Sequence, residues 1–158
     1  MNGRSLFAFL NDLVPPSLAL PGDRVGYIGI ADPVDLRIDR ILVLMDYIPE
    51  CGSASIDFQN YDLVVLHHPP CESPPIPAFV IHSNWDLVTG GACDALADCL
   101  NIQPSDVLDP ATGVGLIGTI RDGPLPISRF LKYVMRSLKI DNLRIVNYGR
   151  HRIISRVG

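Results

Sequence analysis

Long apolar runs are absent from this sequence, and none reaches the roughly 18 apolar residues that a membrane-spanning helix needs. The first residues lead into an amphipathic pattern that contains Asn11 and Asp12, which does not fit the apolar segment of a signal peptide. The four cysteines form no C-x-x-C pair and have no regular spacing. We therefore predict reduced thiols, a cytoplasmic protein and no membrane partner.

Apolar residues make up 47% of the 158 residues, which is enough for one domain with a hydrophobic core. The net charge of −4 argues against a nucleic-acid partner, because such proteins usually carry a basic stripe. The basic residues nearest to a cluster lie at the C-terminal end, where a solvated surface explains them as well as phosphate contacts do: Arg144, Arg150, His151, Arg152 and Arg156.

Apolar periodicity predicts strands that alternate with helices, which indicates an α/β fold with a layered mixed sheet and flanking helices. The predicted helices cover residues 6–13, with Ser5 as the cap, and residues 49–58, 92–100 and 130–138. The predicted strands cover residues 25–30, 40–45, 62–66, 78–81, 113–120, 143–146 and 153–157. We interpret the glycines at 113, 115 and 118 as sites of close backbone packing.

Two adjacent histidines, His67 and His68, follow a buried apolar strand, and Pro69 and Pro70 come directly after them. Neighbouring residues on a regular strand point to opposite faces. The prolines end the strand, so both imidazoles can reach one site. Imidazole is the commonest neutral metal ligand in proteins, which makes this pair a candidate metal site. The alternative is that one histidine caps the strand end while the other lies on the surface.

A second apolar strand ends at His82, and Asp86 follows four residues later. Ligands collect at the carboxyl ends of parallel strands, so His67, His68 and Asp86 should share one edge. Two imidazoles and a carboxylate suit Zn²⁺, Fe²⁺, Mn²⁺ or Ni²⁺. Asp46, at the end of another strand, could accept a hydrogen bond from a ligating imidazole.

Each of these residues also has a purely structural interpretation. Asp86 could be a carboxylate at a helix N-terminus, His82 a core histidine with its hydrogen bonds satisfied, and Asp46 a turn residue. Cys71, which follows in the next loop, is a weaker candidate for a metal ligand or a nucleophile.

Five segments resemble signatures of the Ngg-one-interacting-factor-three-like family, which comprises dinuclear metal-centre proteins also labelled GTP cyclohydrolase 1 type 2 homologues. Residues 62–69 (DLVVLHHP) are similar to its D-L-I-I-x-H-H-P, 82–86 (HSNWD) to its H-T-N-x-D, 90–97 (GGACDALA) to its G-G-x-N-D-x-L-A, 113–118 (GVGLIG) to its G-x-G-R-I-G and 45–50 (MDYIPE) to its L-D-x-T-P-E. The resemblance implies a layered α/β fold, a two-metal site and a ring-shaped homo-oligomer, commonly a hexamer. It also implies that His67, His68 and Asp86 are metal ligands and that His82 lies beside the site.

The sequence departs from the family pattern in three places, one of which is the loop between His68 and His82, where residues 69–77 stand in place of the longer loop and helix of the family. The family's G-H-x-x-x-E-like motif, whose glutamate bridges both metals, has no counterpart in this sequence. The family's W-D-N-x-G motif corresponds to residues 22–26 (GDRVG), which lack the tryptophan and the asparagine. We therefore expect one domain over residues 1–158 that is incomplete relative to the family, resembling its first half to two-thirds. In place of the family's two metals we expect about one.

These observations favour a metal-dependent hydrolase that acts on a small molecule, with His82 as the catalytic acid or base. The alternative is a non-catalytic, oligomeric metal-binding scaffold or a truncated inactive form, which the missing glutamate favours.

Overall fold

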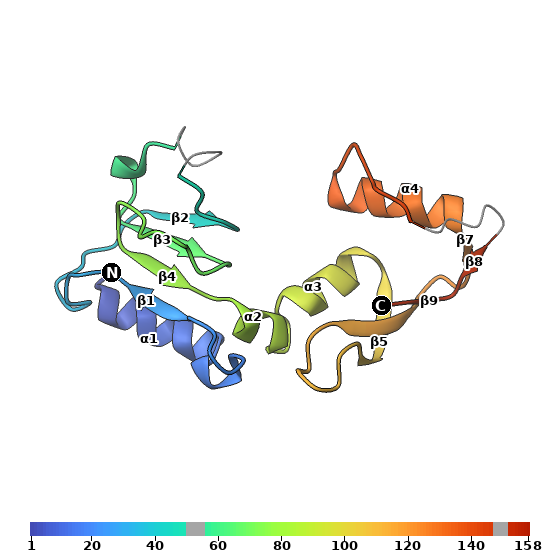
Figure 1. Cartoon of the computed structure of the whole chain (residues 1–158), viewed down its shortest axis with the longest axis horizontal. Helices are drawn as coiled ribbons and strands as arrows, with labels where there is room; N and C mark the ends of the chain where they lie inside the picture. Colours follow the sequence, from blue (N-terminus) through green and yellow to red (C-terminus); the bar gives the residue numbers. More distant parts are fainter. Residues whose placement is uncertain (50–55, 147–151) are drawn as a thin grey trace. The chain divides into compact units, whose positions relative to one another are not determined.

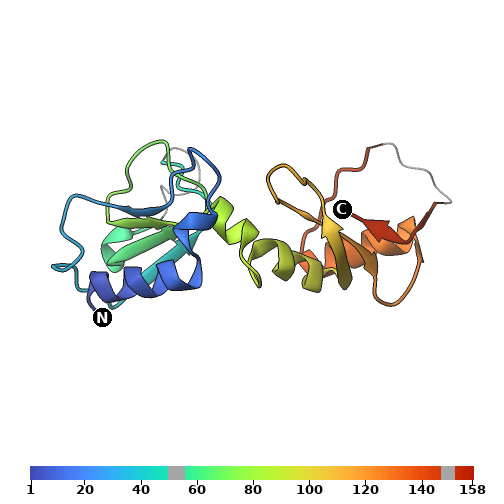
Figure 2. The same ribbon diagram turned by 90° about the horizontal axis from the view of Figure 1, so that it is seen from below.

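The computed structural model of the chain describes residues 1–49, 56–146 and 152–158. The chain divides into two compact units, Met1–Val88 and Thr89–Gly158 (Figures 1 and 2). The predicted mixed α/β class is confirmed, because both units combine short sheets with helices. The expectation of a single domain over residues 1–158 stays a prediction. No helix in the described part of the chain is long and apolar enough to cross a membrane.

The first unit is built on a four-stranded mixed sheet with the order β1-β4-β3-β2. Its strands are β1 (Gly26–Ile28), β2 (Ile41–Leu44), β3 (Leu63–Leu66) and β4 (Ala78–Val80). Strands β2, β3 and β4 are parallel, whereas β1 is antiparallel to β4. As a result, the carboxyl ends of three strands and the beginning of β1 lie at the same edge of the sheet.

The central strand β3 is buried along its whole length, as its continuous apolar run predicts. On one face, helix α1 (Gly3–Leu13) packs Leu6 and Phe7 against Leu63, Val65 and Phe79. The opposite face carries a second buried cluster: Val64, Leu66, Ala78 and Val80. With both faces covered, this strand supplies a rigid base for the residues that follow it.

The helix α1 begins three residues earlier than the sequence pattern indicates, and the predicted cap Ser5 is wrong. Asn2 is the N-cap, and its side-chain oxygen accepts a hydrogen bond of 2.9 Å from the backbone N–H of Ser5. Asparagine at this position satisfies one of the otherwise unpaired N–H groups of the first turn. The described part of the first unit also contains two 3₁₀ turns, Pro16–Leu18 and Phe58–Asn60, and the short helix α2 (Ser83–Leu87).

In its described residues, 89–146 and 152–158, the second unit contains a three-stranded antiparallel sheet, a two-stranded sheet and two helices. Its elements are α3 (Ala92–Cys99), β5 (Ile102–Val107), β6 (Leu116–Ile120), β7 (Leu125–Pro126), α4 (Ile127–Leu138), β8 (Ile153–Ile154) and β9 (Arg156–Val157). Its core consists of Ala97, Ile102 and Ile120, with Phe130 among the side chains packed against it.

Strand β5 is not among the strands that the apolar pattern predicts. It accommodates Pro104, which lacks a backbone N–H for pairing, next to a shift in the pairing register. The predicted strand over 143–146 is wrong, since these residues form no strand. The predicted helix over 49–58 falls largely on residues 50–55, which lie outside the described residues.

The glycine run at 113–118 has the spacing G-x-G-x-x-G, but it leads into strand β6 and not from a strand into a helix. A side chain at Gly118 would clash with the backbone of Gln103 on the neighbouring strand β5. This glycine therefore serves close strand pairing, as expected, and not a dinucleotide.

Candidate metal centre

The His67–His68 pair lies where strand β3 has ended, as the prolines predict. The backbone N–H of His67 donates to the carbonyl of Leu44 at 3.2 Å, and that of His68 donates to the carbonyl of Met45 at 3.0 Å. The two imidazole rings lie together, with 4.7 Å between their centroids. The chain break thus does place two adjacent side chains at one site.

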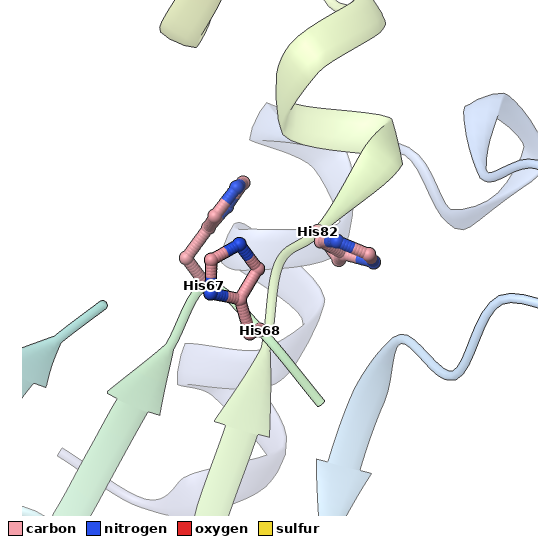
Figure 3. A group of neighbouring side chains, drawn as sticks. All are labelled: His67, His68 and His82. Atoms are coloured by element: carbon pink, nitrogen blue, oxygen red, sulfur yellow. The ribbon is translucent and has the colours of Figure 1, made fainter. Parts of the chain in front are cut away.

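A third imidazole joins this pair from the next strand. His82 follows β4 and is the N-cap of α2, and its ring centroid lies 5.2 Å from that of His67 and 5.4 Å from that of His68. Figure 3 shows the three side chains at the ends of the two neighbouring strands. One nitrogen from each ring lies within 4.8 Å of the others, so the described residues include a group that could hold a metal ion.

All three rings use Nδ1 in the same way, in a hydrogen bond to an oxygen. The oxygens are the Ile81 carbonyl for His67 (2.9 Å), Asp46 Oδ1 for His68 (2.7 Å) and Asp23 Oδ1 for His82 (2.8 Å). Carbonyl and ionised carboxylate oxygens only accept, so Nδ1 must carry the proton. In a neutral ring Nε2 then keeps its lone pair, which is the arrangement found in metal-ligating histidines.

The expected role of Asp46 as an acceptor for a neighbouring imidazole is confirmed by this hydrogen bond. Asp23 is a site residue that the sequence interpretation missed. It comes just before β1, and because β1 is antiparallel to β4 its beginning lies at the same edge as His82. The available signal was the residual match of residues 22–26 to the family's W-D-N-x-G segment.

Asp23 accepts three hydrogen bonds, from His82 Nδ1 and from both the backbone N–H (3.1 Å) and the hydroxyl of Ser83. Ser83 Oγ in turn accepts from the backbone N–H of Leu20 at 2.9 Å. Burial acts to raise the pKa of Asp23, but the hydrogen bonds from His82 and Ser83 outweigh it and hold the pKa below its ordinary value. Asp23 is therefore an ionised partner that fixes the orientation of His82.

Asp86 lies in the first turn of α2, and its Oδ1 is 3.8 Å from His67 Nε2. The structure thus brings Asp86 next to one of the two histidines with which it was predicted to share a metal. His82 supplies a further imidazole at the same place. The assignment of His67, His68 and Asp86 as ligands, with His82 as the catalytic group, stays a prediction. The weaker candidate Cys71 is an exposed free thiol.

The donor set fits a divalent transition metal. Imidazole nitrogens and a carboxylate suit Zn²⁺, Fe²⁺, Mn²⁺ or Ni²⁺, and the fixed protonation of Nδ1 presents the unprotonated nitrogen of each ring. The side chains of His67 and Asp86 are only 16% and 23% exposed, so ion binding here would not require much further desolvation.

Residues 72–158 match the family model described as Duf34/NIF3 (NGG1p interacting factor 3), a span that includes His82 and Asp86. A protein named GTP cyclohydrolase 1 type 2 homolog from Methanothermobacter thermautotrophicus is 49% identical over 113 residues, covering 72% of this chain and 44% of that protein. A protein of the same name from Lactococcus lactis is 27% identical, covering 91% of this chain and 62% of that protein. The chain thus spans about half the length of these relatives.

Two solved structures share the fold. The Bacillus cereus protein related to NIF3 has a TM-score of 0.78 at 14% identity, covering 99% of this chain and 75% of that chain. Reduced HcgD from Methanocaldococcus jannaschii has a TM-score of 0.70 at 22% identity, covering 86% of this chain and 60% of that chain.

Proposed function

We propose that this chain, which belongs to the Duf34/NIF3 (NGG1p interacting factor 3) family, is a divalent-metal-binding protein with hydrolase-like chemistry. The observation that carries the proposal is the set of three imidazoles at one sheet edge, each with Nδ1 bonded to a fixed oxygen. Orienting histidines in this way is what metal sites require and what a packing role does not.

His67, His68 and Asp86 would hold the ion, and His82 would lie beside it. His67 Nε2 and Asp86 are already neighbours, and the ring of His68 lies against that of His67. The resemblance implies two metals per chain, whereas we propose about one for these 158 residues, because the described donor atoms gather at one place.

A bound divalent ion supplies Lewis-acid polarisation and lowers the pKa of a water that it holds. The chain's own contribution is a proton acceptor: His82 can take a proton at Nε2 because its Nδ1 is already protonated toward Asp23. The positive charge that results lies next to the Asp23 carboxylate, as in the His–Asp pairs of hydrolases. His82 is therefore the candidate acid or base of a metal-dependent hydrolysis.

A non-catalytic, metal-binding scaffold is the second candidate. It is favoured by the same donor cluster, the one such group among the described residues, because a hydrolase with two clamping metals needs a second set of anchors. The two candidates differ in turnover. Only the hydrolase requires that the chain hydrolyse a phosphoester or nucleotide and that a His82→Ala variant with normal metal content lose this activity.

Metal content tests the proposal directly. The full chain is loaded with Zn²⁺, dialysed, and measured by elemental analysis beside His67→Ala, His68→Ala, His82→Ala and Asp86→Asn. We expect about one ion per wild-type chain, a clear loss in His67→Ala, His68→Ala and Asp86→Asn, and no loss in His82→Ala. The exposed Asp12→Asn variant matches the charge change of Asp86→Asn and should keep its metal.

Unchanged Zn²⁺ content in both His67→Ala and His68→Ala would overturn the site. A loss in His82→Ala with no loss in Asp86→Asn would replace the proposed ligand set by the three imidazoles.

A further inference from the structure

Positive charge is concentrated in one part of the chain, which the net charge of −4 conceals. Residues 121–158 contain nine of the thirteen Lys and Arg residues but only two of the seventeen Asp and Glu residues. Such charge asymmetry between parts of a chain is typical of proteins that bind polyanions. The remainder of the chain, which includes the candidate metal centre, is acidic.

Helix α4 and its C-cap arrange part of this charge in a line. Arg129, Lys132, Arg136 and Lys139 follow one another at intervals of three, four and three residues, so they lie on one face of the helix. All four are exposed, and α4 contains no acidic residue. The stripe extends over about 15 Å at the helical rise of 1.5 Å per residue.

We call these four side chains the α4 stripe. In the part of the chain that the structure describes, none of them forms an ion pair or a side-chain hydrogen bond. By contrast, Arg37 and Arg121 elsewhere are paired with Asp39 and Asp98. The α4 stripe therefore keeps its full charge for a ligand.

Two hollows flank the middle of the α4 stripe. One, of about 330 Å³, is lined by Leu125, Arg129, Lys132, Tyr133 and Arg136. The other, of about 470 Å³, is lined by Lys132, Met135, Arg136, Lys139, Ile140 and Asp141. Both share Lys132 and Arg136, and the first contains an aromatic ring, Tyr133, with the Arg136 guanidinium 5.7 Å from its centroid.

We propose that the α4 stripe binds single-stranded nucleic acid, with its four cations on successive phosphates and Tyr133 offering a stacking surface to a base. A linear array of cations interleaved with an aromatic ring is how proteins track a single strand without reading its sequence. This proposal is independent of the metal centre and reverses the expectation drawn from net charge alone.

A membrane surface is disfavoured as the partner. A helix that lies on a membrane must insert its apolar face, but in α4 that face is occupied: Phe130 packs against the core of Ala97, Ile102 and Ile120. An acidic peptide would neutralise the same cations but would make no use of Tyr133.

The test is fluorescence anisotropy with the full chain and a labelled single-stranded RNA, in a chelating buffer that removes any metal contribution. We expect binding that weakens with salt, with a slope of log K against log[salt] of about −2.8, which is about −0.7 for each of four phosphates. Lys132→Ala should reduce this slope by about 0.7, and a Lys132→Glu, Arg136→Glu double variant should lose at least about tenfold in affinity.

The matched control is Arg4→Glu, an equal charge change per site on the exposed side of α1 in the first unit. It should leave RNA affinity nearly unchanged. Absence of RNA binding, or equal losses of RNA affinity in Arg4→Glu and Arg136→Glu, would overturn the proposal. Competition with RNA by a poly-glutamate peptide or by anionic vesicles, at equal charge concentration, would also overturn it. Circular dichroism of each exposed-residue variant confirms that it is folded.

Discussion

At the scale of single residues, the candidate site depends on oxygens that hold imidazole rings in place. Asp23 is the most informative of these, because its carboxylate joins His82 to both polar groups of Ser83. Its side chain is only 10% exposed, which is uncommon for an acid without such partners. It should act as a positioning residue for His82.

Replacing Asp23 by Asn should lower metal-dependent hydrolysis about 10–100-fold at a normal Zn²⁺ content, because the change removes the partner that orients His82. An amide can donate to Nδ1, which would move the ring proton to Nε2 and remove the lone pair that accepts a proton. The measurement is hydrolysis of a phosphoester by the Zn²⁺-loaded chain, with Asp12→Asn as the exposed control. Unchanged hydrolysis in Asp23→Asn would contradict the positioning role of Asp23.

The residues at the ends of strands β3 and β4 could be predicted from the sequence, because a buried run followed by prolines fixes where the strand stops. The place of Asp23 beside His82 could not, since the two residues are 59 positions apart and meet only through the antiparallel pairing of β1. The proton positions on the rings were equally inaccessible, because they depend on which oxygens surround each Nδ1.

At the scale of elements, helix α2 is only five residues long and relies on side chains to hold it. Asn84, which is 2% exposed, donates from its amide to the carbonyl of Val14 at 3.0 Å and accepts from the backbone N–H of His82 at 3.0 Å. It thereby connects the end of α1 to the turn that carries His82.

Asn84→Ala should lower the unfolding free energy of the first unit by about 1–3 kcal/mol, because a buried carbonyl and N–H lose their partners. The measurement is chemical denaturation followed by Trp85 fluorescence, which reports on α2 itself. Asn142→Ala is the control, since Asn142 is exposed. Equal stability of wild type and Asn84→Ala would contradict this account of α2.

Asp62 should make the sheet sensitive to acid. It accepts backbone hydrogen bonds from Asp39 (2.9 Å) and Arg40 (2.8 Å) at the start of β2, and these lower its pKa from 3.8. A lowered folded-state pKa gives stability that is present above the unfolded value and is lost as the pH falls through the folded value. Asp62→Asn should thus be less stable than wild type at about pH 6, with a difference that disappears in strong acid.

The check for Asp62 is urea denaturation across this pH range, with the exposed Asp35→Asn as the control. A difference that persists unchanged into strong acid would exclude the proposed role of the carboxylate. Asp62 belongs to the run of residues that predicts β3. Its hydrogen bonds to the backbone before β2 could not be predicted, because they depend on the pairing of two separate strands.

At the scale of the whole molecule, strand β2 lies at the edge of its sheet and exposes apolar side chains. Val43 and Met45 are 71% and 62% exposed, and Ile41 on the same side is 41% exposed. An apolar edge strand is a surface on which a second chain can pack. The family resemblance implies a homo-oligomer, so we expect this chain to self-associate.

Light scattering after size-exclusion chromatography measures the mass of the particle in solution and so tests self-association. We expect a mass above 17.3 kDa that falls toward it in Val43→Asp. Val34→Asp, at a loop residue that is 44% exposed, is the control and should keep the wild-type mass. A monomer mass for the wild-type chain at high protein concentration would contradict the expected self-association.

The most direct test of the metal centre is nitrogen-15 NMR of the chain labelled at histidine and titrated with Zn²⁺. We expect Nδ1-protonated rings for His67, His68 and His82 before the titration, and a Zn²⁺-dependent shift of the Nε2 resonances of His67 and His68, assigned by their alanine variants. Binding through Nδ1, or resonances that do not respond to Zn²⁺, would contradict the proposed metal centre.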